Sequence, residues 1–150
     1  RQRQMCIRDS IGRADFSYVC LDQQYSRVNT PQSVLELAQS CNHGNLQDHE
    51  LKLRLHRALF GQQMWDKRCD TLSGGERMRL CLCSLMIANH VPDLFVLDEP
   101  TNNLDLSSLA ILTRTVRNYR GTLLVVSHDD NFTREIGITR TVGLESPPAE

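Results

Sequence analysis

Strand-length runs of apolar residues occur at three places in the chain: FSYVCL at Phe16–Leu21, LFVLDEP at Leu94–Pro100 and GTLLVVSHD at Gly121–Asp129. The last two are continuously apolar before their polar ends, as expected for central parallel strands buried on both faces. An apolar stripe between them, at Leu106–Tyr119, predicts a helix capped by Asp105. Strand, helix and strand in this order predict a βαβ unit and a parallel sheet.

Three more helices are predicted between the first and second strands. Thr30-Pro31 supplies an N-cap and a first helical position before the apolar face of residues 34–38. A second helix is expected from Gln47 to Phe60, with Gly61 as its stop. The third follows LSGGE, and its stretch Leu80–Ala88 is apolar nearly all round, which predicts a core helix.

Composition narrows the class of protein only slightly. The chain has 150 residues, 40% of them hydrophobic and 23% charged, with a formal net charge of -1. One domain is expected, and the charge gives no footprint for nucleic acid, so we expect no specific DNA binding. The sequence has no apolar run of about 18 residues and no signal-like start, so a cytoplasmic protein without membrane insertion is expected.

The six cysteines, at positions 6, 20, 41, 69, 81 and 83, form no CxxC pair. Three of them lie inside apolar runs, which predicts reduced and mostly buried thiols. Cys81 and Cys83 are two residues apart on a predicted helix, so their side chains point to different faces and cannot share a metal ion.

Two adjacent acids, Asp98 and Glu99, end the second strand. In a nucleotide site, the first acid of such a pair holds the hydrated Mg²⁺ on the terminal phosphates and the second reaches the attacking water. Alternation along the strand and the turn that follows would aim the two carboxylates differently. For the pair alone, an ordinary solvated strand end is an equally good interpretation.

The segment Ser73-Gly74-Gly75-Glu76 opens the third helix of this region. Two glycines leave the backbone N–H groups unhindered at the positive end of the helix dipole, which favours an anion such as a γ-phosphate. Ser73 is placed to donate to that phosphate or to cap the helix. By itself, SGG before a helix is also typical of a plain cap and turn.

LSGGE, FVLDEPTNNLD and SHD, in this order and spacing, resemble the signature, Walker B, D-loop and switch-histidine motifs of ATP-binding-cassette (ABC) ATPases. VCLDQQY resembles the Q-loop, so the similarity covers residues 16–144. The resemblance implies a partial P-loop NTPase-like ABC cassette, an α/β fold with a parallel-sheet core. It would occupy residues 16–145, with a small helical subdomain at about 30–90. Residues 1–15 stay unassigned, which suggests a sequence-end artefact, and 146–150 form a tail.

The resemblance also implies ATP and Mg²⁺ as cofactors and assigns a role to each motif residue. The catalytic residues would be Glu99, as the base, and His128, which would bind the γ-phosphate. Asp98 and Gln23 would be Mg²⁺ ligands, with Gln24 as the alternative to Gln23. The residues that bind ATP would be Gln23, Ser73, Gly74, Gly75 and Glu76. Since family members work as head-to-tail pairs, Ser73, Gly74 and Gly75 would serve a nucleotide held by a second cassette. Gln23, Asp98, Glu99 and His128 would serve the nucleotide of their own cassette. Asn103 and Asp105 would lie at the interface of the pair.

The phosphate-binding loop GxxxxGK[ST] occurs nowhere in the sequence, whose only lysines are Lys52 and Lys67. In the family this loop precedes the Q-loop, so we expect a truncation before Phe16. The full-length parent would be an ATPase, whereas the 150-residue chain alone would be inactive.

LSGGER and DEPTNNLD resemble the ABC-F branch of soluble tandem ATPases that act in translation. The sequence ends soon after TRTVGLE, at residues 139–145, which is expected to be a strand and favours the C-terminal cassette. The implied partners are a second cassette, in the same or another chain, and the ribosome. The alternatives are a nucleotide-binding subunit of a membrane transporter and a non-catalytic interaction module that keeps the fold.

Overall fold

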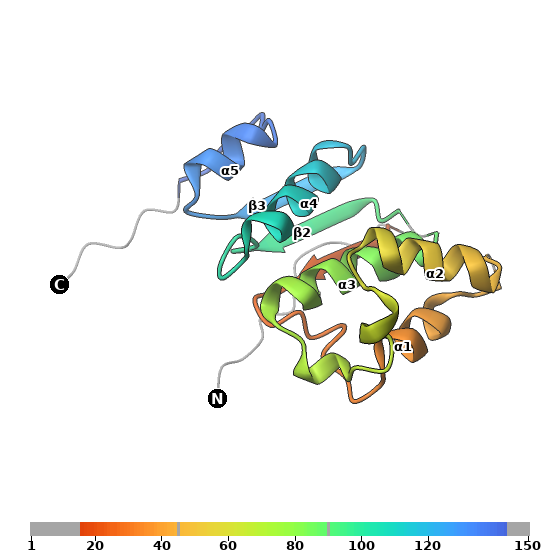
Figure 1. Ribbon diagram of the computed structural model, residues 1–150. Helices are drawn as coiled ribbons and strands as arrows, with labels where there is room; N and C mark the ends of the chain where they lie inside the picture. Colours follow the sequence, from red (N-terminus) through yellow and green to blue (C-terminus); the bar gives the residue numbers. More distant parts are fainter. Residues whose placement is uncertain (1–15, 45, 90, 144–150) are drawn as a thin grey trace, which may run out of the picture.

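A three-stranded parallel sheet is the centre of the computed structural model, which describes residues 16–44, 46–89 and 91–143. Strand β2 (Leu94–Asp98) lies between β1 (Tyr18–Leu21) and β3 (Thr122–Val126). Both pairings are parallel, and Phe95 lies beside Val19 on one side and Leu123 on the other. The predicted α/β fold with a parallel core is confirmed (Figure 1).

The chain between β1 and β2 is helical. It contains α1 (Val34–Cys41), α2 (Asp48–Arg57) and α3 (Gly74–Ile87), and α2 is joined to α3 through the 3₁₀ turns η2 (Gln62–Met64) and η3 (Cys69–Thr71). All three α-helices pack on one another. Most residues of α3 after its first turn are buried, as predicted for a core helix.

Helix α4 (Leu106–Arg117) connects β2 to β3 and completes the predicted βαβ unit, and α5 (Asp130–Glu135) follows β3. In Figure 1, α1, α2 and α3 gather in one part of the molecule, and β3, α4 and α5 gather in another, with β2 between them. Helix α3 contacts α1 and α2 and also contacts α4, so it joins the two parts.

The apolar core lies on one face of the sheet. Side chains alternate along each strand, and those on the core side include Val19, Leu21, Phe95, Leu97 and Val125. Their neighbours along β1 and β3 point the other way and are exposed: Tyr18, Cys20, Leu124 and Val126. One face therefore carries most of the packing between the sheet and the helices.

The predicted start of α1 is wrong. Ser33, not Thr30, is the N-cap, and Pro31 precedes the helix. Ser33 and Glu36 form a capping box in which the Ser33 hydroxyl accepts from the Glu36 N–H at 3.2 Å and the Glu36 carboxylate accepts from the Ser33 N–H at 2.8 Å. This reciprocal pair satisfies two N–H groups, which a threonine followed by proline does not do.

The predicted end of α2 is also wrong, because the helix stops at Arg57 instead of reaching Phe60. Leu59 has a φ of 65°, and the Phe60 N–H donates to the Leu55 carbonyl at 2.9 Å. A left-handed residue therefore closes the helix before Gly61, the predicted stop.

Two expectations about the strands need correction. Strand β3 was predicted to be central, but it is an edge strand of the described sheet, and Leu124 is 47% exposed. Residues 139–143, the described part of the expected strand TRTVGLE, form no strand; 144 and 145 lie outside the described residues. Among the described residues no strand pairs along the outer edge of β3, so β3 lacks the central position that its apolar pattern favours.

The cysteines agree with the prediction of free thiols. The five described ones are unpaired, and Cys69, Cys81 and Cys83 are buried; Cys6 lies outside the described residues. Burial raises the pKa of Cys81 and of Cys83 to about 12, which keeps both thiols protonated. Among the described residues, no cluster of cysteine, histidine and acidic side chains suits a metal ion.

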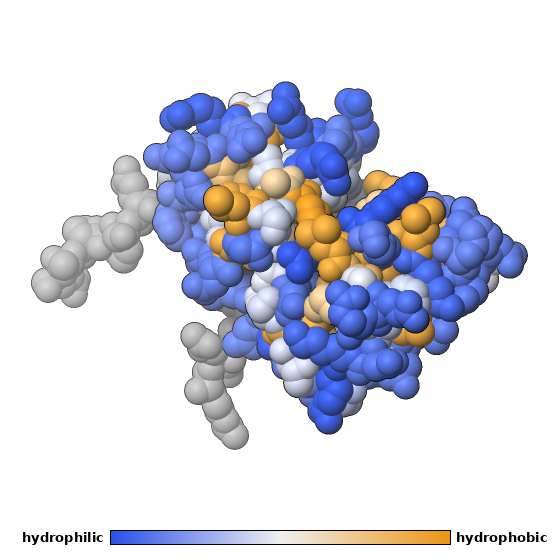
Figure 2. Space-filling model, viewed as in Figure 1, coloured by the Kyte–Doolittle hydropathy of each residue, from blue (hydrophilic) through white to orange (hydrophobic). Residues whose placement is uncertain are grey.

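Apolar side chains also gather at the surface between α4 and α2 (Figure 2). A pocket of about 280 Å³ lies there, lined among others by Leu85, Met86, Val91, Phe95 and Tyr119. It lies near the amino end of β2, whereas Asp98 lies at the carboxyl end.

The capping box of α1 predicts a stability difference between two single substitutions. Ser33→Ala should lower the free energy of unfolding by about 1 kcal/mol, because it removes the acceptor for the Glu36 N–H. Thr30→Ala is the matched control and should cost less, because Thr30 is not the cap. Urea denaturation of the two variants measures both values, and a larger loss for Thr30→Ala would contradict this assignment.

Candidate functional site

The polar ends of β2 and β3 meet at one edge of the sheet. Asp98 is the last residue of β2 and pairs in register with Val126, the last residue of β3. Glu99 follows Asp98 directly, and His128 comes two residues after Val126. Parallel pairing thus brings the three predicted site residues to the same edge, which is the ligand edge of such sheets.

Glu99 adopts an unusual backbone conformation. Its φ is 47°, in the left-handed region, which costs a non-glycine residue about 1 to 2 kcal/mol. Two hydrogen bonds hold this turn: the Glu99 N–H donates to the Val126 carbonyl at 2.8 Å, and the Asn102 N–H donates to the Glu99 carbonyl at 3.2 Å. The turn ends β2 and sends the Glu99 side chain towards the end of β3.

The Glu99 side chain meets His128 there. The distance from Glu99 Oε2 to His128 Nδ1 is 2.8 Å, and Glu99 is 19% exposed at its side chain while His128 is 74% exposed. Among the described residues, Oε2 is buried with no other polar partner, so it depends on a proton carried by Nδ1. The hydrogen bond and the negative charge of Glu99 raise the pKa of His128 above its ordinary value.

The neighbours of His128 hold its backbone. The Asp129 N–H donates to Ser127 Oγ at 3.0 Å, and the Asp129 carboxylate accepts from the N–H groups of Asn131 and Phe132, both at 3.0 Å. Asp129 is thus the N-cap of α5. The SHD motif therefore forms a short, hydrogen-bonded turn that presents the imidazole outward.

Asp98 and Gln23 lie at the same edge of the sheet. Asp98 is half-buried, and its carboxylate forms no hydrogen bond or ion pair with another described residue. Gln23 follows β1 and is exposed, as is Gln24, so exposure alone does not choose between the two glutamines. Tyr25 joins this loop to the turn after Glu99, because its hydroxyl donates to the Pro100 carbonyl at 3.4 Å.

The glycine-containing segment opens α3 as predicted. Ser73 is the N-cap, and its hydroxyl accepts from the Glu76 N–H at 3.3 Å. Ser73 and Gly74 are exposed, and a Cβ added to Gly74 would meet nothing within 4 Å. The positive end of α3 is therefore open to an anion at Ser73 and Gly74.

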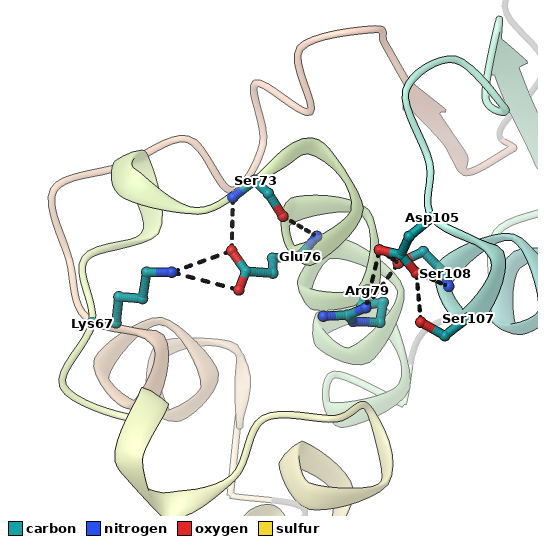
Figure 3. Close-up of polar contacts among 7 residues, drawn as sticks. All are labelled: Lys67, Ser73, Glu76, Arg79, Asp105, Ser107 and Ser108. Atoms are coloured by element: carbon teal, nitrogen blue, oxygen red, sulfur yellow. Dashed lines mark hydrogen bonds and ion pairs between the residues drawn. The ribbon is translucent and has the colours of Figure 1, made fainter.

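Glu76 is engaged within the chain. Its carboxylate accepts from the Ser73 N–H at 2.7 Å and lies 3.3 Å from the Lys67 ammonium, as Figure 3 shows. Burial alone would raise the pKa of the Glu76 carboxyl, but the bonds from Ser73 and Lys67 hold that pKa below its ordinary value. Its oxygens thus cap the helix, so a bound anion would meet N–H groups and not this carboxylate.

The segment after β2 ends at Asp105, the N-cap of α4. Asn103 is exposed with a φ of 59°, a conformation that asparagine tolerates better than most residues. Asp105 accepts from the Ser108 N–H at 2.8 Å and from the Ser107 hydroxyl. Both residues proposed for the interface therefore lie on one short connection between β2 and α4.

Three residues near these motifs were not predicted to have a role: Lys67, Arg79 and Ser108. Lys67 precedes Glu76 by nine residues, and no short pattern links the two. Arg79 could have been found from the sequence, because it directly precedes the apolar stretch Leu80–Ala88 of a predicted core helix, and a buried arginine needs a partner. That partner is Ser108, whose hydroxyl accepts from Arg79 at 2.8 Å.

Residues 8–102 match the ABC transporter family. The chain belongs to this family. The motifs at 73–76 and 98–99 lie within the matched residues, and the βαβ unit continues beyond them. This ABC cassette is similar to ABC-F proteins in particular, as its relatives show.

Among its relatives is the energy-dependent translational throttle protein EttA of Haemophilus influenzae, 34% identical over 131 residues, which are 84% of this chain and 22% of EttA. EttA of Escherichia coli is 36% identical over 77% of this chain and 20% of its own length. ABC transporter F family member 5 of Arabidopsis thaliana is 40% identical over 64% of the chain and 13% of its own length. The cassette thus spans about a fifth or less of these relatives.

Solved structures show the same fold. RNase-L Inhibitor superposes with a TM-score of 0.61 at 23% identity, over 84% of this chain and 25% of that one. A dimeric ATP-binding cassette in a post-hydrolysis state with ADP and Pi gives a TM-score of 0.56 at 22% identity, over 80% and 56% of the two chains. None of the helices in the described part of this cassette has the length and apolar character needed to cross a membrane.

The contact between Glu99 and His128 predicts a specific titration. NMR of the His128 ring should give a pKa above the ordinary value, and Glu99→Gln should lower it, because the substitution removes the negative charge. Asp98→Asn is the matched control and should leave the His128 pKa unchanged, since Asp98 is not among its causes.

The sign of the stability effect follows from the raised pKa. The pair stabilises the fold fully below the ordinary histidine pKa, and this stabilisation is lost as pH rises through the raised pKa. The stability gap between the wild type and Glu99→Gln should therefore shrink with rising pH. A His128 pKa that does not respond to Glu99→Gln would show that the two side chains are apart in solution.

Proposed function

We propose that the protein carrying this chain is an ABC-F type ATPase that binds and hydrolyses ATP and acts on the ribosome. The observation that carries the ATPase proposal is the contact of Glu99 with His128 at 2.8 Å, beside Asp98, at the carboxyl edge of a parallel sheet. The ends of β2 and β3 thus bring together a base, Glu99, a proton-bearing partner, His128, and a carboxylate without a partner among the described residues, Asp98.

Each of these groups has a chemical part in hydrolysis. Glu99 would accept a proton from the attacking water, since its Oε2 has only the His128 ring as a partner among the described residues. His128, charged more readily because its pKa is raised, would donate to the γ-phosphate and hold Glu99 in place. The left-handed turn at Glu99 supports this assignment, because strained backbone often occurs where a side chain must be aimed.

The residues present fit magnesium and the terminal phosphates of ATP in part. Asp98 offers an oxygen ligand without a partner among the described residues, which suits a hard cation, and Gln23 is the amide ligand proposed beside it. When bound, Mg²⁺ would neutralise charge on the phosphates. The 150 residues contain no GxxxxGK[ST] loop, so we also propose that the chain alone has negligible ATPase activity.

The open end of α3 would serve a different nucleotide. Ser73 and Gly74 are exposed with free space around Gly74, so they would face an ATP held by a second cassette. Asn103 and Asp105 would lie at the same interface. Glu76 is proposed to act there through its helix cap and not through direct contact with ATP, because its oxygens are already bound.

The ribosome is proposed as the partner because relatives of this chain include EttA, described as an energy-dependent translational throttle protein, and an ABC transporter F family member. Cosedimentation of the full-length protein with ribosomes in the presence of ATP tests this part. Copurification with a membrane-embedded subunit instead would favour a transporter.

Glu99→Gln provides the test of the ATPase proposal in the full-length protein. Turnover should fall by at least about a hundredfold while ATP still binds, because the substitution removes the base and keeps the shape of the side chain. The measurements are phosphate release and the affinity for ATP.

Glu135→Gln is the matched control, since Glu135 is an exposed acid on α5. Its turnover should equal that of the wild type. Undiminished phosphate release by Glu99→Gln, or equal losses in both variants, would reject Glu99 as the base.

A further inference from the structure

Arg79 is a buried cation in the second turn of α3, and only 8% of the residue is exposed. One of its terminal nitrogens, Nη1, donates to Ser108 Oγ at 2.8 Å and lies 3.8 Å from Asp105 Oδ2 (Figure 3). The guanidinium also lies over the ring of Phe60, 5.9 Å from its centroid. Nε is buried and has no partner among the described residues, so the buried charge depends on Ser108 and Asp105.

The same two residues lie against the first turn of α3. A Cβ on Gly75 would come within 2.7 Å of Ser108 Oγ and 2.9 Å of Asp105 Oδ2, which is too close for any other residue without movement. Asp105 Oδ2 also accepts from Ser108 Oγ at 3.0 Å. Gly75, Ser108 and Asp105 therefore form one tight contact. Arg79, one turn after Gly75 along α3, bonds to the Ser108 hydroxyl of this contact and lies near the Asp105 carboxylate.

We propose that Arg79 is a positioning residue that locks the start of α4 to the start of α3, so that residues 73–75 and residues 103–105 move as one unit. The inference rests on the proposed function. There, Ser73 and Gly74 serve a nucleotide held by a second cassette. Residues 103–105 lie on the connection that begins after Asp98 and Glu99, which serve the nucleotide of their own cassette. Arg79 touches neither nucleotide and acts through Ser108 and Asp105.

The chemistry of the contact suits a lock. The Asp105 side chain is 54% exposed, whereas the Arg79 side chain is buried. The Arg79 charge is therefore the member of the pair that is stabilised most by keeping the contact. Bonds from Ser107 and Ser108 fix the Asp105 carboxylate as the cap of α4. A shift of α4 away from α3 would leave the arginine charge without an acceptor in the interior, which makes a partial separation unfavourable.

The test compares ATP turnover by variants of the full-length protein that carries this chain. Arg79→Met keeps the length of the side chain and removes the charge. It should lower kcat by about tenfold to a hundredfold, because catalytic groups displaced by about 1 Å lose activity of that order. KM for ATP should stay within about twofold, since Arg79 touches no nucleotide. Amides of residues 103–108 should exchange hydrogen faster.

Two further variants separate positioning from folding. Ser108→Ala removes the acceptor of Arg79 but keeps the N–H that Asp105 caps, so it should lower kcat at a temperature where the variant stays folded. It should also lower Tm, because the buried Arg79 charge loses its 2.8 Å acceptor. Combined with Arg79→Met, it should add no further loss, because both substitutions remove one interaction. Arg79→Lys should restore part of kcat. Arg114→Met, at an exposed arginine of α4, is the matched control and should match the wild type.

The outcomes distinguish a failure of this inference from a failure of the proposed ATPase function. If the wild type hydrolyses ATP and Glu99→Gln stops it, while Arg79→Met and Ser108→Ala keep the wild-type kcat, the lock is wrong and the ATPase proposal stands. A lower Tm with unchanged kcat for the folded protein also rejects the lock. If the wild type does not hydrolyse ATP, the proposed function fails, and this inference fails with it.

Discussion

The left-handed turn at Glu99 is the constraint on which the candidate site depends. Without it, β2 would continue past Asp98, and Glu99 would follow the strand instead of reaching His128. The bond from the Glu99 N–H to the Val126 carbonyl ties this turn to the last residue of β3. The strain is therefore held by the sheet, and the two polar strand ends become one site.

A second organising contact joins the first turns of α3 and α4. The missing side chain of Gly75 lets Ser108 and Asp105 approach the helix that Ser73 begins. The glycine pair thus has two separable parts in this chain: Gly74 keeps the helix end open, and Gly75 permits the close packing. Because α3 also packs on α1 and α2, movement of the helical part would reach α4 through this contact.

Much of the arrangement of Asp98, Glu99 and His128 could be predicted from the sequence, because parallel strands bring their carboxyl ends to one edge. Asp105 as the cap of α4 followed from its place before an apolar helix. Other features depend on contacts between distant residues. The pairing of Glu76 with Lys67 and of Arg79 with Ser108 has no local pattern, and the φ of Glu99 comes from its bond to Val126.

The wrong start predicted for α1 has a local cause that the apolar pattern alone did not reveal. Thr30 and Ser33 both suit an N-cap, and the choice came from Glu36, which can bond back only to Ser33. The apolar run of β3 resembled that of a central strand, yet its place in the sheet depends on which strands lie beside it. The amino-acid composition of a strand does not show which strands will lie beside it.

The most direct test of the account is an experimental structure of the full-length Glu99→Gln protein with ATP and Mg²⁺. The account predicts Mg²⁺ on Asp98, the γ-phosphate beside residue 99 and His128, and a second nucleotide on Ser73 and Gly74. Nucleotide bound away from this edge of the sheet, with position 99 and His128 apart, would contradict it.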